Sequence, residues 1–173
     1  FQALARRAAA VNHPGVQPIY SCGSEEGMPY LVSQFMVGGS LAARLSDRPA
    51  GQESIRQAAE WLRNVAAGLQ AASALGVVHG AVSPQSIFFD ADGNAKVGDF
   101  GVDILRFGSV AAWRSCGRDL APYVSPEVLA GTAPSAVSDI FGIGAVLYHV
   151  LTGHGPCGPG GADGAEAMRF WQE

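Results

Sequence analysis

Three stretches of the chain carry apolar residues at the spacing of an α-helix. The clearest is 52–75, where intervals of three and four residues place the apolar side chains on one face. These side chains are Ile55, Ala58, Leu62, Val65, Leu69 and Ala72. Residues 1–11 show the same pattern, whereas 138–151 are apolar on nearly every side. The pattern therefore predicts two amphipathic helices and one buried helix.

Shorter apolar runs bounded by turn-forming residues predict β-strands. Val16–Cys22 and Met28–Phe35 flank the polar loop 23–27 and together predict a hairpin. The remaining predicted strands are Val77–Val78, Ile87–Phe89 and Ala95–Gly98. The turn 90–94 lies between the last two strands, so we expect them to pair.

Glycine and polar residues separate these elements. Residues 37–39 predict a flexible joint, after which Ser40 is expected to cap a short helix that ends at Leu45. Residues 102–126 have no clean period and predict a long ordered loop, and a second loop, 153–164, precedes a short C-terminal helix. A small α/β part is thus followed by a mostly helical part.

Composition and charge narrow the class of protein. The 173 residues correspond to one domain or a piece of one, and because the chain opens at Phe1 we expect a fragment of a longer protein. With 48% hydrophobic and 15% charged residues, a packed core is expected rather than disorder. The net charge of -4 means that basic residues are not in excess, which argues against a nucleic-acid partner.

Cysteine use and hydropathy bear on the compartment. Cys22, Cys116 and Cys157 are scattered with no close pair, which predicts reduced thiols. The longest apolar run, 140–151, is too short for a membrane span of about 20 residues. There is no signal-peptide pattern. We therefore expect a cytoplasmic location and no membrane segment in this chain.

Four motifs follow one another in a characteristic order. They are the loop 79–87, Asp99-Phe100-Gly101, Ser125-Pro126-Glu127 and the start of the helix 138–151. In order and spacing they resemble the eukaryotic-like protein kinase family, and within it the bacterial serine/threonine kinases. One tripeptide alone would mean little, so the spacing carries the resemblance.

The resemblance implies an α+β, protein kinase-like fold truncated at both ends. Residues 1–36 would supply one helix (αC of the family) and two strands of the small N-terminal lobe. Residues 37–173 would form the mostly helical C-terminal lobe up to the start of αG, with the activation segment at 102–127 and αF at 138–151. Both parts would belong to a single kinase-like domain.

The catalytic loop of the family reads H-R-D-L-K-x-x-N, and this chain departs from it at the positions that carry chemistry. Gly80 replaces the arginine that senses phosphorylation, and Ala81 replaces the aspartate that accepts the substrate hydroxyl proton. Ser83 replaces the lysine, and Ser86 replaces the asparagine that holds a second Mg²⁺. The sequence therefore predicts no catalytic residue.

Other positions of the family's site have also changed. Leu4 lies where αC carries the glutamate that pairs with an ATP-anchoring lysine, and Leu120 replaces the activation-segment threonine. Lys96 is the only lysine and precedes Asp99, so it is not that anchor. The glycine-rich loop and the anchoring lysine would come before Phe1.

Five residues remain candidates for nucleotide binding. Ser33 would be the gatekeeper, and the backbones of Gln34 and Met36 would face an adenine. Phe88 lies beneath the adenine position, where it either stacks on the base or fills the pocket, and we favour filling. Asp99 is either a weak Mg²⁺ ligand or a residue kept for the turn, and we favour the turn.

The functional prediction is a catalytically impaired pseudokinase that acts as a regulatory or binding module of a larger signalling protein, with a protein partner. Asp139, on αF, is expected to hold the backbone of the catalytic loop, a structural role. Two alternatives stay open: a divergent serine/threonine kinase that uses ATP and Mg²⁺ through Asp99, and a gene fragment without function.

Overall fold

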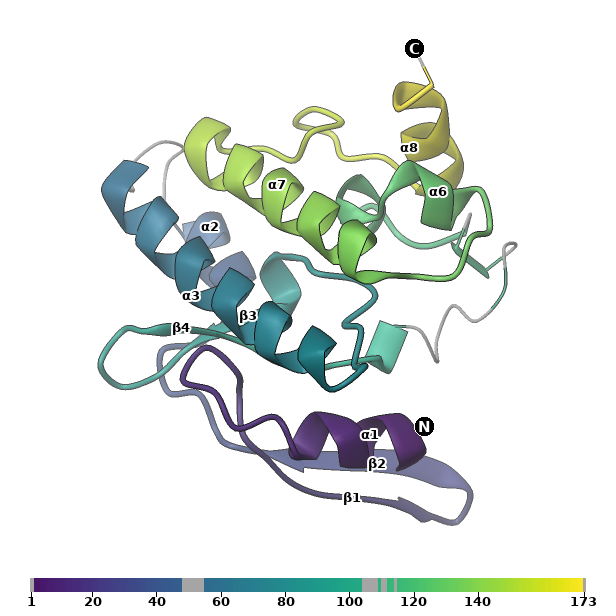
Figure 1. Cartoon of the computed structure of the whole chain (residues 1–173). Helices are drawn as coiled ribbons and strands as arrows, with labels where there is room; N and C mark the ends of the chain where they lie inside the picture. Colours follow the sequence, from purple (N-terminus) through teal and green to yellow (C-terminus); the bar gives the residue numbers. More distant parts are fainter. Residues whose placement is uncertain (1, 48–54, 104–108, 110–111, 114, 173) are drawn as a thin grey trace.

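The computed structural model describes residues 2–47, 55–103, 109, 112–113 and 115–172. A helix and a β-hairpin form one end of the molecule, a long helix crosses its middle, and the C-terminal helices form the other end (Figure 1). The predicted α+β class is confirmed.

The N-terminal end consists of α1 (Gln2–Ala9) and the antiparallel strands β1 (Ile19–Glu25) and β2 (Met28–Ser33). The prediction of a five-residue hairpin loop is wrong, since Glu25 already pairs with Met28. Glu26 and Gly27 make the turn with positive φ angles of 49° and 81°. Two such residues form a turn whose twist matches that of the strands.

The next two elements are helices. Ser40 caps α2 (Leu41–Asp47), as predicted, because its hydroxyl oxygen accepts a hydrogen bond from the Ala43 N–H at 3.2 Å. The central helix α3 (Ile55–Ala74) buries the predicted face from Ala58 to Ala72, whereas Ile55 is 75% exposed. The predicted joint at 37–39 is held rather than flexible, since Gly38 and Gly39 exchange backbone hydrogen bonds with Phe89.

A second, short hairpin pairs β3 (Ile87–Phe89) with β4 (Ala95–Val97), as predicted. The predicted strand Val77–Val78 is wrong. The Val77 N–H donates to the Ala72 carbonyl at 3.0 Å and so completes the end of α3, and no strand of the described residues lies beside it.

The C-terminal end holds α6 (Pro126–Leu129), α7 (Ala136–Thr152) and α8 (Gly164–Phe170). Gly153, at φ 82°, ends α7 as predicted. The prediction that α7 is buried all round is wrong: one face is exposed, because α3, the loop 79–82 and the segment 121–123 pack against other sides of the helix. The exposed residues of α7 are Val137, Ile140, Gly144, Tyr148, Leu151 and Thr152. None of the described helices is both long and apolar enough to cross a membrane.

Two hydrophobic clusters hold these elements together. The larger joins α1, α3, β3, β4 and α7, with the Trp61 and Phe89 rings edge to face at 4.8 Å. The smaller lies at the C-terminal end and contains Ala81, Trp113 and Cys116. The loop 79–86 runs between the two clusters, and this position determines the surroundings of its side chains.

Candidate functional site

Asp139 of α7 fixes the loop that carries the first motif. Asp139 is 5% exposed, and its carboxylate accepts hydrogen bonds from the backbone N–H groups of His79, at 2.9 Å, and Gly80, at 2.8 Å. Burial raises the pKa of Asp139, while His79 and the two N–H donors act against that shift. The predicted role of Asp139 is confirmed.

His79 connects this loop to the turn at 99–101. Its Nε2 lies 2.8 Å from the Gly98 carbonyl oxygen, and its Nδ1 accepts from the Ala81 N–H at 3.3 Å. These two partners place the ring proton on Nε2. The His79 carbonyl also accepts from the Gly101 N–H at 3.1 Å. The loop is therefore rigidly held, although it has no regular secondary structure.

Ala81, where the family carries its catalytic aspartate, faces an apolar environment. Its side chain is 4% exposed and belongs to the cluster that contains Trp113 and Cys116. The same surroundings raise the pKa of the Cys116 thiol to about 11, mainly by burial. No proton acceptor replaces the aspartate at this point, because the methyl group lies among apolar atoms.

The two serines of the loop are bonded to each other. The Ser86 hydroxyl donates to the Ser83 carbonyl and accepts from the Ser83 N–H, both at 3.1 Å. Ser83 is 2% exposed and Ser86 is 4% exposed. Neither hydroxyl is presented to a phosphate or a metal ion.

Asp99 and Gly101 adopt left-handed backbone conformations, with φ angles of 57° and 71°. Burial and the nearby Asp103 carboxylate raise the pKa of Asp99, while His79 opposes the shift. Among the described residues none donates a hydrogen bond to the Asp99 carboxylate. Leu4 of α1 covers this turn so closely that a β-carbon on Gly101 would lie 2.0 Å from its Cδ2.

Lys96 is held away from the candidate site. Its Nζ donates to the Pro14 carbonyl at 2.7 Å and lies 3.7 Å from the Asp90 carboxylate. Asp90 lies in the turn of the β3–β4 hairpin, and Pro14 belongs to the segment between α1 and β1. The only lysine of the chain therefore stabilises the fold locally.

The residues that the resemblance to kinases aligns with the hinge, the segment that faces the adenine, are 33–36, and they lie where β2 ends. The Gln34 N–H donates to the Pro18 carbonyl at 2.9 Å, and the Gln34 carbonyl accepts from Nε2 of Gln17 at 2.8 Å. Met36 is buried, and Ser33 pairs with Ile19 in the hairpin. The Gln17 side chain was missed by the sequence analysis, although a lone amide in the apolar run 16–22 is a usable signal.

Phe88 and Gly98 lie close to the Gln17 side chain that contacts the hinge. The Phe88 ring is half-buried, and its edge lies 3.0 Å from where a β-carbon on Gly98 would be. Gln17 Oε1 lies beside the same point. The structure thus brings Gln34, Phe88 and the residue before Asp99 together around the Gln17 side chain.

These residues do not fit ATP with Mg²⁺, the ligand pair that protein kinases use. The hinge carbonyl is already hydrogen-bonded, the two serines are bonded to each other, and Leu4 supplies no carboxylate. The described residues contain no group of three or more side chains suited to hold a metal ion. Asp99 supplies one carboxylate and Asp103 lies near it, whereas Mg²⁺ requires about six oxygen ligands.

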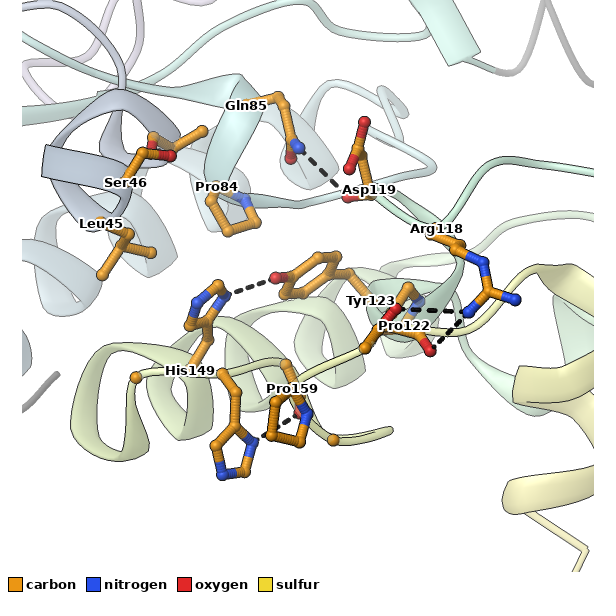
Figure 2. A pocket seen from close by; sticks show the side chains of 17 residues that line it. Leu45, Ser46, Pro84, Gln85, Arg118, Asp119, Pro122, Tyr123, His149 and Pro159 are labelled. Carbon is orange, nitrogen blue, oxygen red and sulfur yellow. Dashed lines mark hydrogen bonds between the residues drawn. The ribbon is translucent and has the colours of Figure 1, made fainter.

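An open cavity of about 330 Å³ lies on the other side of the loop and was also missed (Figure 2). We call it the α7 cleft. It is bounded by α2, by Pro84 and Gln85, by the segment 118–123 and by the end of α7. The Tyr123 hydroxyl is hydrogen-bonded to His149 Nδ1, and the Gln85 amide donates to the Asp119 carbonyl at 3.1 Å.

Arg118 closes one wall of the α7 cleft. Its guanidinium donates to the Gly160 and Gly161 carbonyls (Figure 2). It also pairs with Glu166 at 2.9 Å. These contacts fix the glycine-rich loop 153–163 against the segment 118–123. The cleft is therefore a preformed hollow with polar groups on its rim.

Comparisons with known proteins agree with the motifs. A family model described as the protein kinase domain matches residues 5–170. The chain is 34% identical over 158 residues to the serine/threonine-protein kinase PknL of Mycobacterium tuberculosis, covering 90% of this chain and 39% of the relative. It is 32% identical over 162 residues to the serine/threonine-protein kinase PknB of the same organism, covering 90% of this chain and 26% of the relative. The chain thus spans well under half of the relatives it matches.

Proposed function

Because the chain belongs to the protein kinase domain family, we propose that it is part of a catalytically silent, pseudokinase-type module that serves a larger signalling protein as a regulatory or binding part. The proposal rests on one observation above all. The position of the catalytic base is Ala81, and its side chain is buried among apolar residues.

The loop supports this proposal because the contacts that hold its backbone are present, whereas the side chains that would carry out phosphoryl transfer are replaced. Asp139 and His79 hold the backbone, and Gly98 and Gly101 are tied to the same loop. General-base catalysis alone contributes roughly 10²–10⁴-fold to a rate, and charge neutralisation by metal and lysine adds to it. A chain that keeps only the scaffold is suited to present a surface.

The α7 cleft supports the binding part of the proposal. It is open, lies beside the silent loop and has both hydrogen-bonding and ionisable groups on its rim. A polypeptide segment of a partner protein would find there the exposed amide of Gln85 and the imidazoles of His149 and His154. Such a wet, polar rim is typical of protein–protein contacts.

The deciding experiment is a phosphotransfer assay with radiolabelled ATP, Mg²⁺ and a serine/threonine peptide. We expect no label on the peptide or on the chain, and Asp99→Ala is the matched control. Transfer that depends on Mg²⁺ and is abolished by Asp99→Ala would contradict the proposal. The same assay on the longer protein that contains this segment extends the test to the whole kinase domain.

Phosphate transfer that depends on Mg²⁺ and on Asp99 would favour a second candidate function, that of a divergent serine/threonine kinase. The observation in its favour is Asp99, whose carboxylate has no hydrogen-bond donor among the described residues and is thus available to a cation. The relatives' names, serine/threonine-protein kinases, also point that way. Activity of the longer protein together with silence of this chain would place the missing groups outside these 173 residues.

A further inference from the structure

Gln17 lies in the short segment between α1 and β1, and its side chain is almost completely buried, at 6% exposure. Its backbone N–H donates to the Val97 carbonyl at 2.8 Å, which fixes the residue beside β4. Its side-chain Nε2 donates to the Gln34 carbonyl at 2.8 Å. Gln17 therefore joins the hinge, through its side chain, to β4, the strand that leads to Asp99, through its backbone.

The other end of the carboxamide rests on Gly98. A β-carbon on Gly98 would lie 2.0 Å from Gln17 Oε1 and 3.0 Å from Phe88 Cε2. Any other residue at position 98 would collide with the amide as it is placed here. Gln17, Gly98 and Phe88 therefore pack closely against one another.

The hydrogen bond to Gln34 has the chemistry of a bond to a purine. The resemblance to kinases implies that the Gln34 backbone faces an adenine, whose exocyclic amino group is an N–H donor. A carboxamide NH₂ is also a donor, and it already lies at hydrogen-bond distance from that carbonyl. A base and the amide cannot occupy the same position.

We propose that the Gln17 carboxamide occupies the position of a purine amino group at the hinge, so that the nucleotide site is closed by a side chain of the protein itself. A purine binds only when Gln17 moves away, and its apparent affinity falls by the fraction of molecules in which Gln17 has moved. This inference concerns the base alone, so it is independent of whether phosphoryl transfer occurs.

The second hinge group expected to face a base, the Met36 backbone N–H, can still donate a hydrogen bond to a ligand. Across the residues that the structure describes, no hydrogen bond is made by the Met36 N–H, although Met36 is 6% exposed. Removal of the Gln17 amide would thus leave one acceptor, on Gln34, and one donor, on Met36, for a purine edge.

The test uses adenosine, which carries no phosphate and needs no metal ion. Its dissociation constant is measured by NMR titration of the ¹⁵N-labelled chain for the wild type, Gln17→Val and the control Gln70→Val. Gln70 is exposed on α3, so the control makes the same chemical change away from the hinge. We expect Gln17→Val to bind adenosine about fivefold more tightly or better, the factor that one net hydrogen bond supplies.

Equal behaviour of the wild type and Gln17→Val, whether both bind adenosine or neither does, would overturn the inference. If Gln17→Val does not fold, Gln17→Glu supplies the test by its melting temperature. A protonated carboxyl can donate to the Gln34 carbonyl as the amide does, whereas the ionised form cannot. We expect Gln17→Glu to melt well below the wild type at pH 7 and to approach it near pH 4. A difference that does not depend on pH would contradict the bond.

Discussion

Two neighbouring regions of the molecule treat their polar groups in opposite ways. In the loop floor, which we define as residues 79–83, Ser86, 99–101 and Asp139, the side chains of His79, Ser86 and Asp139 are buried and hydrogen-bonded within the chain, whereas Asp99 is half-buried. In the α7 cleft, Gln85, Arg118 and Asp119 are exposed and the histidines are half-buried. The boundary is sharp, because Gln85 of the cleft directly precedes Ser86 of the loop floor.

The difference indicates what each region is kept for. Buried polar groups must be satisfied whether or not a reaction occurs, since an unpaired group in the interior costs about 1–3 kcal/mol. The contacts of the loop floor therefore do not depend on whether the chain catalyses a reaction. Exposed groups on the rim of a hollow carry no such constraint, so the α7 cleft is free to serve a ligand.

The largest expected effect is that of Asp139→Ala. The substitution leaves the N–H groups of His79 and Gly80 buried without an acceptor, so we expect the free energy of unfolding to fall by about 3 kcal/mol. Urea unfolding monitored by circular dichroism measures it. Asp92→Ala, at an exposed turn, is the control and should change stability by less than about 0.5 kcal/mol. A midpoint unchanged by Asp139→Ala would show that the loop floor is not held by this carboxylate.

Gly101→Ala comes next. A β-carbon there meets both a left-handed backbone and the Leu4 side chain, so we expect a loss of about 2–3 kcal/mol. Gly93→Ala has a similar φ, 80°, but open space around it, so it should cost only about 1 kcal/mol. The same unfolding measurement gives both values. When Leu4→Ala is already present, the additional cost of Gly101→Ala should fall towards the cost of Gly93→Ala. If Leu4→Ala leaves the cost of Gly101→Ala unchanged, the collision with Leu4 is not its cause.

Arg118→Ala tests the α7 cleft. The ion pair with Glu166 is largely exposed, with side-chain exposures of 54% and 38%, so we expect a loss of about 0.5–1 kcal/mol. The loss should shrink in 1 M salt, because exposed charges are screened. If Arg118→Ala lowered the free energy of unfolding as much as Asp139→Ala does, the two regions would not differ in how strongly their polar contacts stabilise the fold.

The smallest effect concerns pH. Burial, and then the nearby His154, lower the pKa of His149, while Tyr123 stays neutral because burial raises its pKa. The unfolded chain therefore takes up the proton first, and the stability that His149 contributes is lost as the pH falls below the ordinary histidine value of 6.5. Urea midpoints at pH 7.5 and 5.5 should differ less in His149→Gln than in the wild type. An identical pH dependence would show that His149 titrates as in the unfolded chain.

Periodicity and motif spacing were enough to predict part of the fold. The buried face of α3 follows from apolar residues three and four positions apart in the sequence. The role of Asp139 follows from its place in the motif order, and its carboxylate contacts the loop backbone as expected. The features that could not be predicted depend on which neighbours are present. An apolar sequence at 136–152 does not say which side of α7 another element covers, and two valines at 77–78 do not form a strand without a partner.

The candidate site shows the same limit. The substitutions at Ala81, Ser83 and Ser86 could be read from the sequence, because each stands at a motif position. The bond between Gln17 and Gln34 joins residues 17 positions apart through a side chain, and the α7 cleft gathers five separate segments. Such contacts are visible only in the packed structure.

The bonds from His79 and Gly80 to Asp139 have a consequence for hydrogen exchange. Amides in a segment without regular secondary structure usually exchange quickly, but these two are buried and bonded to a helix 59 and 60 residues away in sequence. Their protons can exchange only when the loop separates from α7, which requires opening of the contact between the large elements. The two amides are therefore expected to be among the slowest to exchange, and they would report the stability of the whole C-terminal part.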